Sequence, residues 1–150
     1  MQDRHRGPFI LHPASEVMRM SEIRFIQPPL GPSAIGPYSP AVASGGLLFV
    51  SGQIPRDADG TVVADSIEAA TRQALHNLRA VLAAAGCAPH DVVKTTVFLQ
   101  DLADFEGMNR AYAEFFGDHR PARSTVQVAR LPANARVEID CIAVLGSMAQ

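Results

Sequence analysis

The chain has 150 residues, of which 47% are hydrophobic and 19% are charged, a composition typical of one globular domain rather than of a disordered chain. Its formal net charge of −2 and sequence pI of about 6.2 give no electrostatic basis for binding nucleic acid or an anionic membrane surface. No apolar run is long enough to cross a bilayer, and the two cysteines, Cys87 and Cys141, fit a reduced compartment, so a cytoplasmic protein is expected.

The first 20 residues differ from the rest and are predicted to be a disordered extension, followed by one domain over residues 21–150. They mix charges and prolines around one short apolar run, Phe9 to Leu11, which is shorter than the apolar core of a secretory signal. Residues 27–40, QPPLGPSAIGPYSP, then carry too many prolines and glycines for a helix and indicate a shaped loop.

Two short apolar segments follow this loop, and their connection predicts a β-hairpin. Residues 41–43 and 47–51 are separated by Ser44-Gly45-Gly46, and a Gly-Gly pair suits a tight turn between strands. SGQIP, residues 51–55, closes the second strand, and DADGT, residues 57–61, predicts a further turn.

Apolar residues at intervals of three and four predict a helix from Ile67 to Ala85. Either Asp65 or Ser66 can cap its start, and Glu68 stands in capping-box spacing from Asp65. Gly86 supplies a left-handed stop at the other end. The apolar stripe consists of Ile67, Ala70, Ala74, Leu75, Leu78, Val81, Leu82 and Ala85.

The second half of the chain predicts three more strands and one more helix. Residues 91–99, DVVKTTVFL, are rich in β-branched side chains and indicate a strand buried on at least one face. A helix is expected from near Asp104 to Gly117, and strands over residues 124–129 and 136–144. In the last strand one face is apolar and consists of Val137, Ile139, Cys141 and Ala143.

The resulting order, β-β-α-β-α-β-β, predicts an α+β fold in which one sheet carries both helices on one face. The second face of the sheet is then left without cover, because a chain of this length has no further element to place there. Oligomerisation is the simplest way to bury that face.

Five segments in this order resemble the RidA (YjgF) family of enamine/imine deaminases, over roughly residues 21–145. They are AIGPYSPAV (34–42), FVSGQIP (49–55), VVKTTVFLQDLADF (92–105), RPARSTVQVARLP (120–132) and VEIDCIAV (137–144). The resemblance implies a chorismate-mutase-like α+β fold, assembled as a homotrimer with three clefts between subunits. It also implies hydrolysis of short 2-enamino or 2-imino acids, such as 2-aminoacrylate and 2-iminobutanoate, to 2-keto acids and ammonia, without a cofactor.

The resemblance assigns the two catalytic roles to Arg123 and Glu138. The arginine of the PARS motif, here Arg123, is expected to bind the substrate carboxylate, and the glutamate of the last strand, here Glu138, is expected to act on the attacking water. Tyr38 and Ser51 are expected to line the pocket, and Asn109 to lie near it.

Thr125 departs from the family pattern, because many members carry a cysteine two residues after the motif arginine. A thiol nucleophile at this position is therefore ruled out for this chain. Thr125 is expected to contribute to substrate binding through its backbone, which a hydrolysis without a covalent intermediate permits.

The chemistry of an imino acid suits these residue types. The carbon beside the carboxylate is already electrophilic, so orientation and a positioned water suffice. A guanidinium holds a carboxylate by two parallel bonds, which fix its plane as well as its position. Taken without the resemblance, however, the residues leave two alternatives open: Arg123 as an interface salt bridge, and Glu138 as a solvated strand residue.

Two other functions stay open at this point. One is deamination of a larger amino-diacid such as 2-aminomuconate, for which Arg56 or Arg130 is the candidate second cation. The other is a non-catalytic role, in which the chain binds carboxylate metabolites or acts as a chaperone. No metal site is expected, because the five histidines show no ligand spacing, and neither nucleic acid nor a membrane is expected as a partner.

Overall fold

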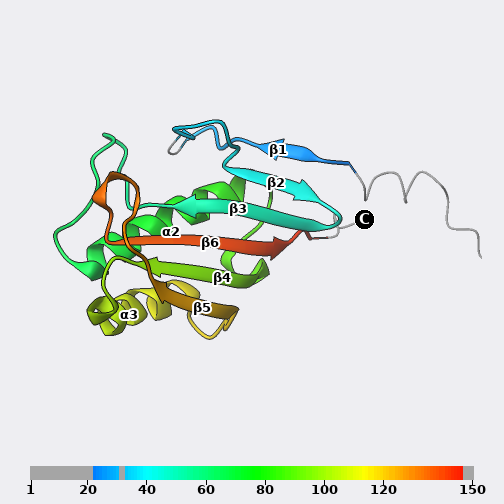
Figure 1. The fold of residues 1–150 in the computed structure, drawn as a ribbon. Coiled ribbons are helices and arrows are strands. Elements are labelled where there is room, and N and C mark those ends of the chain that lie inside the picture. Colours follow the sequence, from blue (N-terminus) through cyan, green and yellow to red (C-terminus); the bar gives the residue numbers. More distant parts are fainter. Residues whose placement is uncertain (1–21, 31–32, 147–150) are drawn as a thin grey trace, which may run out of the picture.

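The computed structural model describes residues 22–30 and 33–146, which form one six-stranded sheet and two helices (Figure 1). The predicted disordered extension, residues 1–20, lies outside the described residues. The sheet order is β1-β2-β3-β6-β4-β5. The strands are β1 (Arg24–Ile26), β2 (Ala41–Ser44), β3 (Leu47–Gln53), β4 (Val92–Leu99), β5 (Ala122–Gln127) and β6 (Val137–Val144), and the helices are α2 (Ile67–Ala84) and α3 (Phe105–Phe116).

The predicted hairpin is confirmed and is formed by β2 and β3. Ser44 pairs with Leu47, so the turn consists of Gly45 and Gly46, whose φ angles of 60° and 79° favour glycine. Strand β1, which pairs with the outer side of β2, was not predicted from the sequence. Strand β1 has only three residues, and Gln27, Pro28 and Pro29 follow it, so the segment is too short to show a periodicity.

Helix α2 begins as predicted, and the structure decides between its two candidate caps. The hydroxyl of Ser66 accepts a hydrogen bond from the backbone N–H of Ala69 at 3.0 Å, so Ser66 is the cap and Asp65 is not. The capping box suggested by Glu68 does not form, because that carboxylate is bonded to Arg110 of α3.

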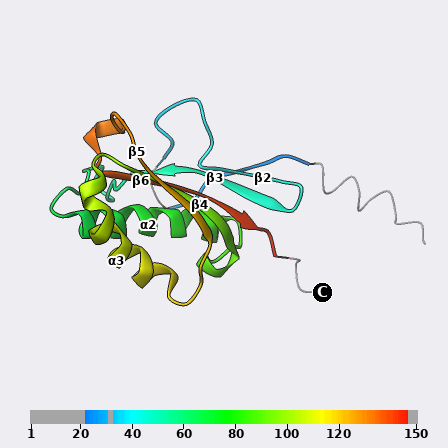
Figure 2. The ribbon, with the colours of Figure 1, turned by 60° about the horizontal axis from the view of Figure 1, so that its bottom comes forward.

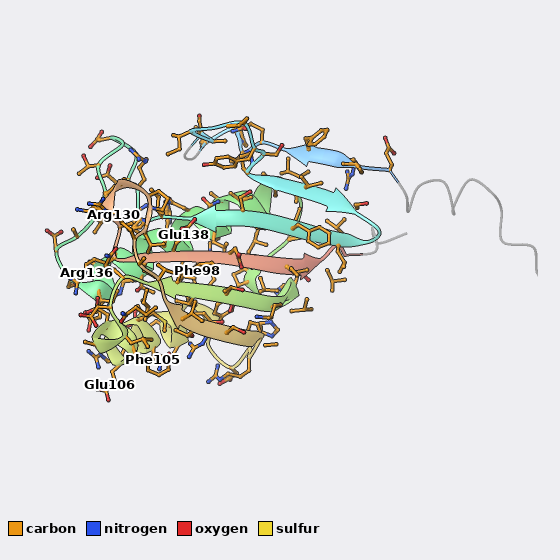
Figure 3. All side chains as sticks on the ribbon, viewed as in Figure 1. Phe98, Phe105, Glu106, Arg130, Arg136 and Glu138 are labelled. Carbon is orange, nitrogen blue, oxygen red and sulfur yellow. The ribbon has the colours of Figure 1, made fainter. Side chains whose placement is uncertain are left out.

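Helix α3 starts after a short 3₁₀ turn over Leu102–Asp104. Asp104 does not cap it with its side chain, because its carboxylate binds Arg136 at 2.8 Å just before β6. Figure 3 labels Arg136 at this end of the sheet, beside α3. The pair fixes the start of α3 against the start of β6.

Strand β5 runs two residues earlier than the predicted range of 124–129. It pairs in parallel with β4, and Ala122 and Arg123 already stand opposite Lys94 and Thr95. Regular pairing ends at Gln127, although the N–H of Val128 still donates to the carbonyl of Leu99 at 3.0 Å. This earlier start places Arg123 inside the strand rather than in the turn before it.

Both helices pack on one face of the sheet, as the element order predicted (Figure 2). The apolar face of β6 points into this layer, and the four residues predicted for it are all buried. Phe49, Val126 and Val144 keep 44%, 43% and 44% of their surface exposed; Phe49 and Val126 stand on the face opposite the helices. This open face matches the expectation that led to the prediction of an oligomer, which stays a prediction. Within residues 22–30 and 33–146, the helices include none long and apolar enough to span a membrane.

Candidate active site

Arg123 lies on β5 with its side chain on the helix-covered side of the sheet. Its strand partner Thr95 is completely buried on that side. The guanidinium carbon stands 4.8 Å from the ring centre of Tyr112 and 5.6 Å from that of Phe105, both on α3. A cation within about 6 Å of an aromatic face is attracted by the ring, so the two rings hold the guanidinium in one place.

A hydrogen bond to Thr95 of β4 holds Tyr112 in place. Its hydroxyl is 2.8 Å from the hydroxyl of Thr95, and the residue is 8% exposed. Burial raises the pKa of Tyr112, with the Thr95 hydrogen bond and the charge of Arg123 acting in the opposite direction. The raised pKa keeps the phenol neutral near pH 7, so Tyr112 supports the cation with its ring rather than as a phenolate.

The guanidinium of Arg123 forms neither an ion pair nor a hydrogen bond to any side chain in the part of the chain that the structure describes. Two buried polar atoms near it also lack partners there, Oδ1 of Asn109 and Oγ1 of Thr125. Arg123 and Asn109 line a cavity of about 310 Å³. A buried polar group without a partner is costly, which makes this cluster a candidate for binding a polar ligand.

Glu138 lies on the opposite face of the sheet. On β6 it stands directly across from Phe98 of β4, and both point away from the helices; Figure 3 labels the two on neighbouring strands. Glu138 lines a second cavity, of about 220 Å³, beneath the loop that follows β1. The other lining residues are Ser33, Ala34, Ile35, Tyr38, Pro40, Gly52, Gln53, Ile54, Arg56 and Pro132.

Burial raises the pKa of Glu138 above that of an exposed glutamate, and the nearby Asp140 carboxylate raises it further. A carboxyl in such a place holds its proton at higher pH than usual. A raised pKa suits a residue that exchanges protons with water or with a leaving amine.

We expect Asp140→Asn to move the acid limb of the kcat/KM profile to lower pH. Removing the Asp140 charge lowers the pKa of Glu138, so its carboxylate form persists further into acid. The asparagine oxygen can still accept the 3.2 Å bond from the Thr96 N–H, which protects the strand pairing. The measurement is a pH–rate profile of both proteins. A limb that stays in place would show that some group other than Glu138 limits the rate in acid.

Gly52 makes room for the Glu138 side chain. It lies in β3 where the pairing with β6 shifts register, between Val50 and Gln53. A Cβ atom at position 52 would stand 2.8 Å from the Glu138 carboxyl carbon, closer than real contacts allow. Glycine at position 52 therefore leaves the space that the Glu138 carboxylate occupies beside the β3 backbone.

Gly52→Ala is expected to lower kcat by at least about tenfold, because the added methyl forces the Glu138 carboxylate out of position. Thermal unfolding and a pH–rate profile should accompany the assay, since a displaced Glu138 also changes its pKa. Gly146→Ala is the matched control, because a Cβ there meets nothing within 4 Å. Wild-type rates in Gly52→Ala would mean that Glu138 can move without loss.

Tyr38 and Ser51 take different places around this second cavity. Tyr38 lines it and is 51% exposed, and its hydroxyl accepts a weak bond of 3.4 Å from the Ile35 N–H. The hydroxyl of Ser51 donates to the carbonyl of Ser39 at 2.6 Å, which fastens the loop to β3. The structure thus gives Ser51 a positioning contact, and its predicted role in substrate binding stays a prediction.

Two amide side chains that were not predicted as functional hold one wall of this cavity in place. Asn77 is 3% exposed, and its Nδ2 donates to the carbonyls of Ile54 and Arg56 at 3.0 and 2.8 Å. Gln73 supports it by donating to its Oδ1 at 3.0 Å. The two amides hold the segment that lines the cavity beside Glu138. The available signal was a polar residue between Ala74 and Leu78, inside the apolar stripe of α2.

Arg56 and Arg130, the two candidate second cations, lie in different places. Arg56 lines the cavity of Glu138, where its Nη1 donates to the carbonyl of Gly60 at 2.7 Å. Arg130 lines neither of the two cavities and is exposed. The candidate site residues therefore form two groups, one around Arg123 with Asn109 and one around Glu138 with Tyr38, on opposite faces of one sheet.

Comparison with known proteins gives one consistent result. The profile of the family described as endoribonuclease L-PSP matches residues 30–145. A protein of Salmonella typhimurium named 2-iminobutanoate/2-iminopropanoate deaminase is 48% identical over 116 residues, 75% of this chain and 91% of that protein. A RutC family protein of Pyrococcus horikoshii is 47% identical over 125 residues, 83% of this chain and 98% of that protein.

A solved structure agrees with this result. The structure of the YjgF gene product of Escherichia coli is similar with a TM-score of 0.76 and 46% sequence identity, over 81% of this chain and 98% of that one. The chain belongs to the endoribonuclease L-PSP family, whose members include the RidA (YjgF) deaminases, as its five sequence motifs predicted.

Proposed function

We propose that this protein hydrolyses short 2-imino acids and their 2-enamino tautomers, such as 2-iminobutanoate and 2-aminoacrylate, to 2-keto acids and ammonia. The observation that carries the proposal is the state of Arg123. Its guanidinium is stacked on two rings and has no acidic partner among the described residues, and two buried polar groups beside it also lack partners. The names of relatives that are 47–48% identical support the same chemistry.

In this reaction Arg123 binds the carboxylate through two parallel hydrogen bonds and so fixes the plane of the adjoining C=N carbon. Water adds its oxygen to that carbon, and a proton passes to the nitrogen. The C–N bond then breaks, ammonia leaves, and the remaining C–O bond becomes the carbonyl of the keto acid. Glu138 takes a proton from the attacking water and returns one to the leaving nitrogen.

The proposal requires that neighbouring copies of the chain complete each other's sites. Arg123 and Glu138 belong to opposite faces of one sheet, so one copy does not present both to one small substrate. A homotrimer with three clefts between subunits, each combining the Arg123 half of one copy with the Glu138 half of another, resolves this. The exposed Phe49 and Val126 on the open sheet face supply apolar surface for such contacts.

A coupled assay tests the proposal directly. A threonine dehydratase releases 2-iminobutanoate, and the appearance of 2-ketobutanoate is followed with and without this protein in a buffer where spontaneous hydrolysis is slow. We expect a faster, protein-dependent rate that is proportional to protein concentration. Binding of 2-ketobutanoate without any acceleration would instead establish a non-catalytic carboxylate-binding protein.

Analytical ultracentrifugation of the same preparation tests the assembly. We expect a mass three times that of the 16.0 kDa chain. A fully active monomer would refute the shared site, since one copy holds the two halves apart.

The family description also names RNA cleavage, and the histidine positions bear on it. Nε2 of His119 is hydrogen-bonded to the carbonyl of Val92 at 2.7 Å. Nε2 of His90 lies 3.5 Å from Oδ1 of Asp91, the next residue in the chain. Neither these nor His76, the third histidine within the described ranges, lines the cavity of Arg123 or that of Glu138. The geometry therefore favours the imine hydrolase.

A further inference from the structure

The start of α3 is tied to β5 and to the start of β6 by polar contacts. The backbone N–H of Leu102 donates to Oε1 of Gln127 on β5 at 2.9 Å. Asp104, the residue before the helix, accepts two hydrogen bonds from Arg136, at 2.8 Å from Nη2 and at 3.3 Å from Nε. A guanidinium that binds a carboxylate through two bonds fixes its orientation as well as its distance. The Asp104 side chain is 17% exposed and that of Arg136 is 34% exposed, so water and salt screen this pair less than a pair on the open surface.

The residue that this ion pair places is Phe105. It follows Asp104 directly, and its ring centre lies 5.6 Å from the guanidinium carbon of Arg123. The other ring beside that guanidinium belongs to Tyr112, which is 8% exposed and hydrogen-bonded to β4. Phe105 is 38% exposed, so the packing around it confines it less. Its position against Arg123 therefore depends on how firmly the start of α3 is held.

The described contacts of Arg136 lead to α3 and not to Glu138, although Arg136 precedes Glu138 by only two positions. Its guanidinium binds Asp104, and its carbonyl accepts a hydrogen bond from the N–H of Gln100 at 3.0 Å. The raised pKa of Glu138 has burial as its first cause and the charge of Asp140 as its second. Figure 3 labels Arg136 and Phe105 toward the same end of the sheet.

We propose that Asp104 and Arg136 are positioning residues for substrate binding, because their ion pair holds Phe105 against the guanidinium of Arg123. The inference rests on the proposed function for the role of Arg123 and adds two residues that do not touch the substrate. Without the pair, the first turn of α3 can move away, and Arg123 samples more orientations before a carboxylate binds to it. Substrate and transition state both carry that carboxylate, so the loss appears in affinity rather than in kcat.

A double-mutant cycle with Arg136→Met and Phe105→Leu tests this coupling, with 2-ketobutanoate as an unreactive ligand in titration calorimetry. Methionine keeps an unbranched apolar stem at position 136 without the guanidinium. Each single variant is expected to weaken binding about two- to fivefold, the size of one contact between a cation and a ring at a partly exposed site. The double variant should bind no more weakly than the weaker single variant, because both changes remove the same contact.

Arg72→Met is the matched control, since Arg72 of α2 also binds α3 through two bonds. Its Nε and Nη2 donate to Glu114 at 3.0 and 3.2 Å, near the opposite end of α3 from Phe105. This variant should keep the wild-type affinity. Asp104→Ala removes the ion pair from its other side and should match Arg136→Met, so a folding defect in one variant leaves the other to decide.

Unchanged affinity in Arg136→Met and Asp104→Ala would overturn the inference, as would losses that multiply in the double variant or an equal loss in Arg72→Met. In the coupled assay, KM for 2-iminobutanoate should rise by the same factor as the dissociation constant, while kcat stays within about twofold. A fall in kcat alone would connect Arg136 to Glu138 instead and would also overturn the inference.

The two arms separate failure of this inference from failure of the proposed function. Binding of 2-ketobutanoate by wild type without any turnover would refute the hydrolase, while the calorimetric cycle would still decide the role of the ion pair. Turnover by wild type with an additive cycle would refute the ion pair alone. No binding of 2-ketobutanoate and no turnover by wild type would overturn both.

Discussion

Replacing Arg123 with alanine is expected to lower kcat/KM for 2-iminobutanoate by about a hundredfold to ten-thousandfold. A hydrogen bond to a charged group contributes about 1.5–3 kcal/mol, and in the proposed reaction the guanidinium makes two of them to the substrate carboxylate. Their sum of about 3–6 kcal/mol corresponds to two to four powers of ten in rate at 1.36 kcal/mol each. The measurement is the dehydratase-coupled assay, with the variant at equal concentration.

The fold should survive this change. The described contacts of Arg123 are its stacking on Tyr112 and Phe105, which is worth about 1 kcal/mol. Arg123→Lys is the matched control, because it keeps the charge but loses the planar fork, so its activity should lie between those of alanine and wild type. Wild-type turnover in a folded Arg123→Ala protein would reject the assigned role.

Glu138→Gln is expected to lower kcat by about a hundredfold to ten-thousandfold, the usual contribution of a positioned acid–base group. The amide fills the same space but neither accepts a proton from water nor returns one. Binding of 2-ketobutanoate should change by less than about threefold, because that ligand is already at the end of the reaction. Pre-steady-state kinetics and calorimetry separate the two effects.

The Asp140→Asn protein is a suitable comparison for this variant. Asp140→Asn also removes one carboxylate charge, but from a residue two positions from Glu138 on the same face of β6. It should shift the pH profile rather than abolish turnover. Equal losses of rate and of keto-acid affinity in Glu138→Gln would move Glu138 from the proton transfer to substrate binding.

Most of the fold could be predicted from local patterns. The hairpin at Gly45-Gly46, the apolar stripe of α2 and the alternation of β6 each depend on residues close together in the chain, and the structure confirms all three. The choice of Ser66 over Asp65 as cap was not predictable, since both side chains are able to accept the bond. The structure shows Ser66 as the cap and the Glu68 carboxylate bonded to Arg110 of α3.

The sequence predicted a set of candidate site residues but not their arrangement. Thr125 and Asn109 are placed near Arg123 with unpartnered polar atoms, and Tyr38 lines the same cavity as Glu138. The supporting contacts were not visible in the sequence. Nothing in the sequence indicates that Gly52 leaves room for the carboxylate of Glu138, which lies 86 residues further along the chain.

By itself, the sequence determined the types and order of the predicted elements, the apolar face of each regular segment and the family. Only the tertiary structure decided that Arg123 and Glu138 stand on opposite faces. Strand β5 lies at the edge of the sheet, and its apolar Val126 points to the open face while Arg123 points to the helix side. An alternating pattern shows which residues share a face, but which face that is depends on pairing with β4, a contact between distant parts of the chain.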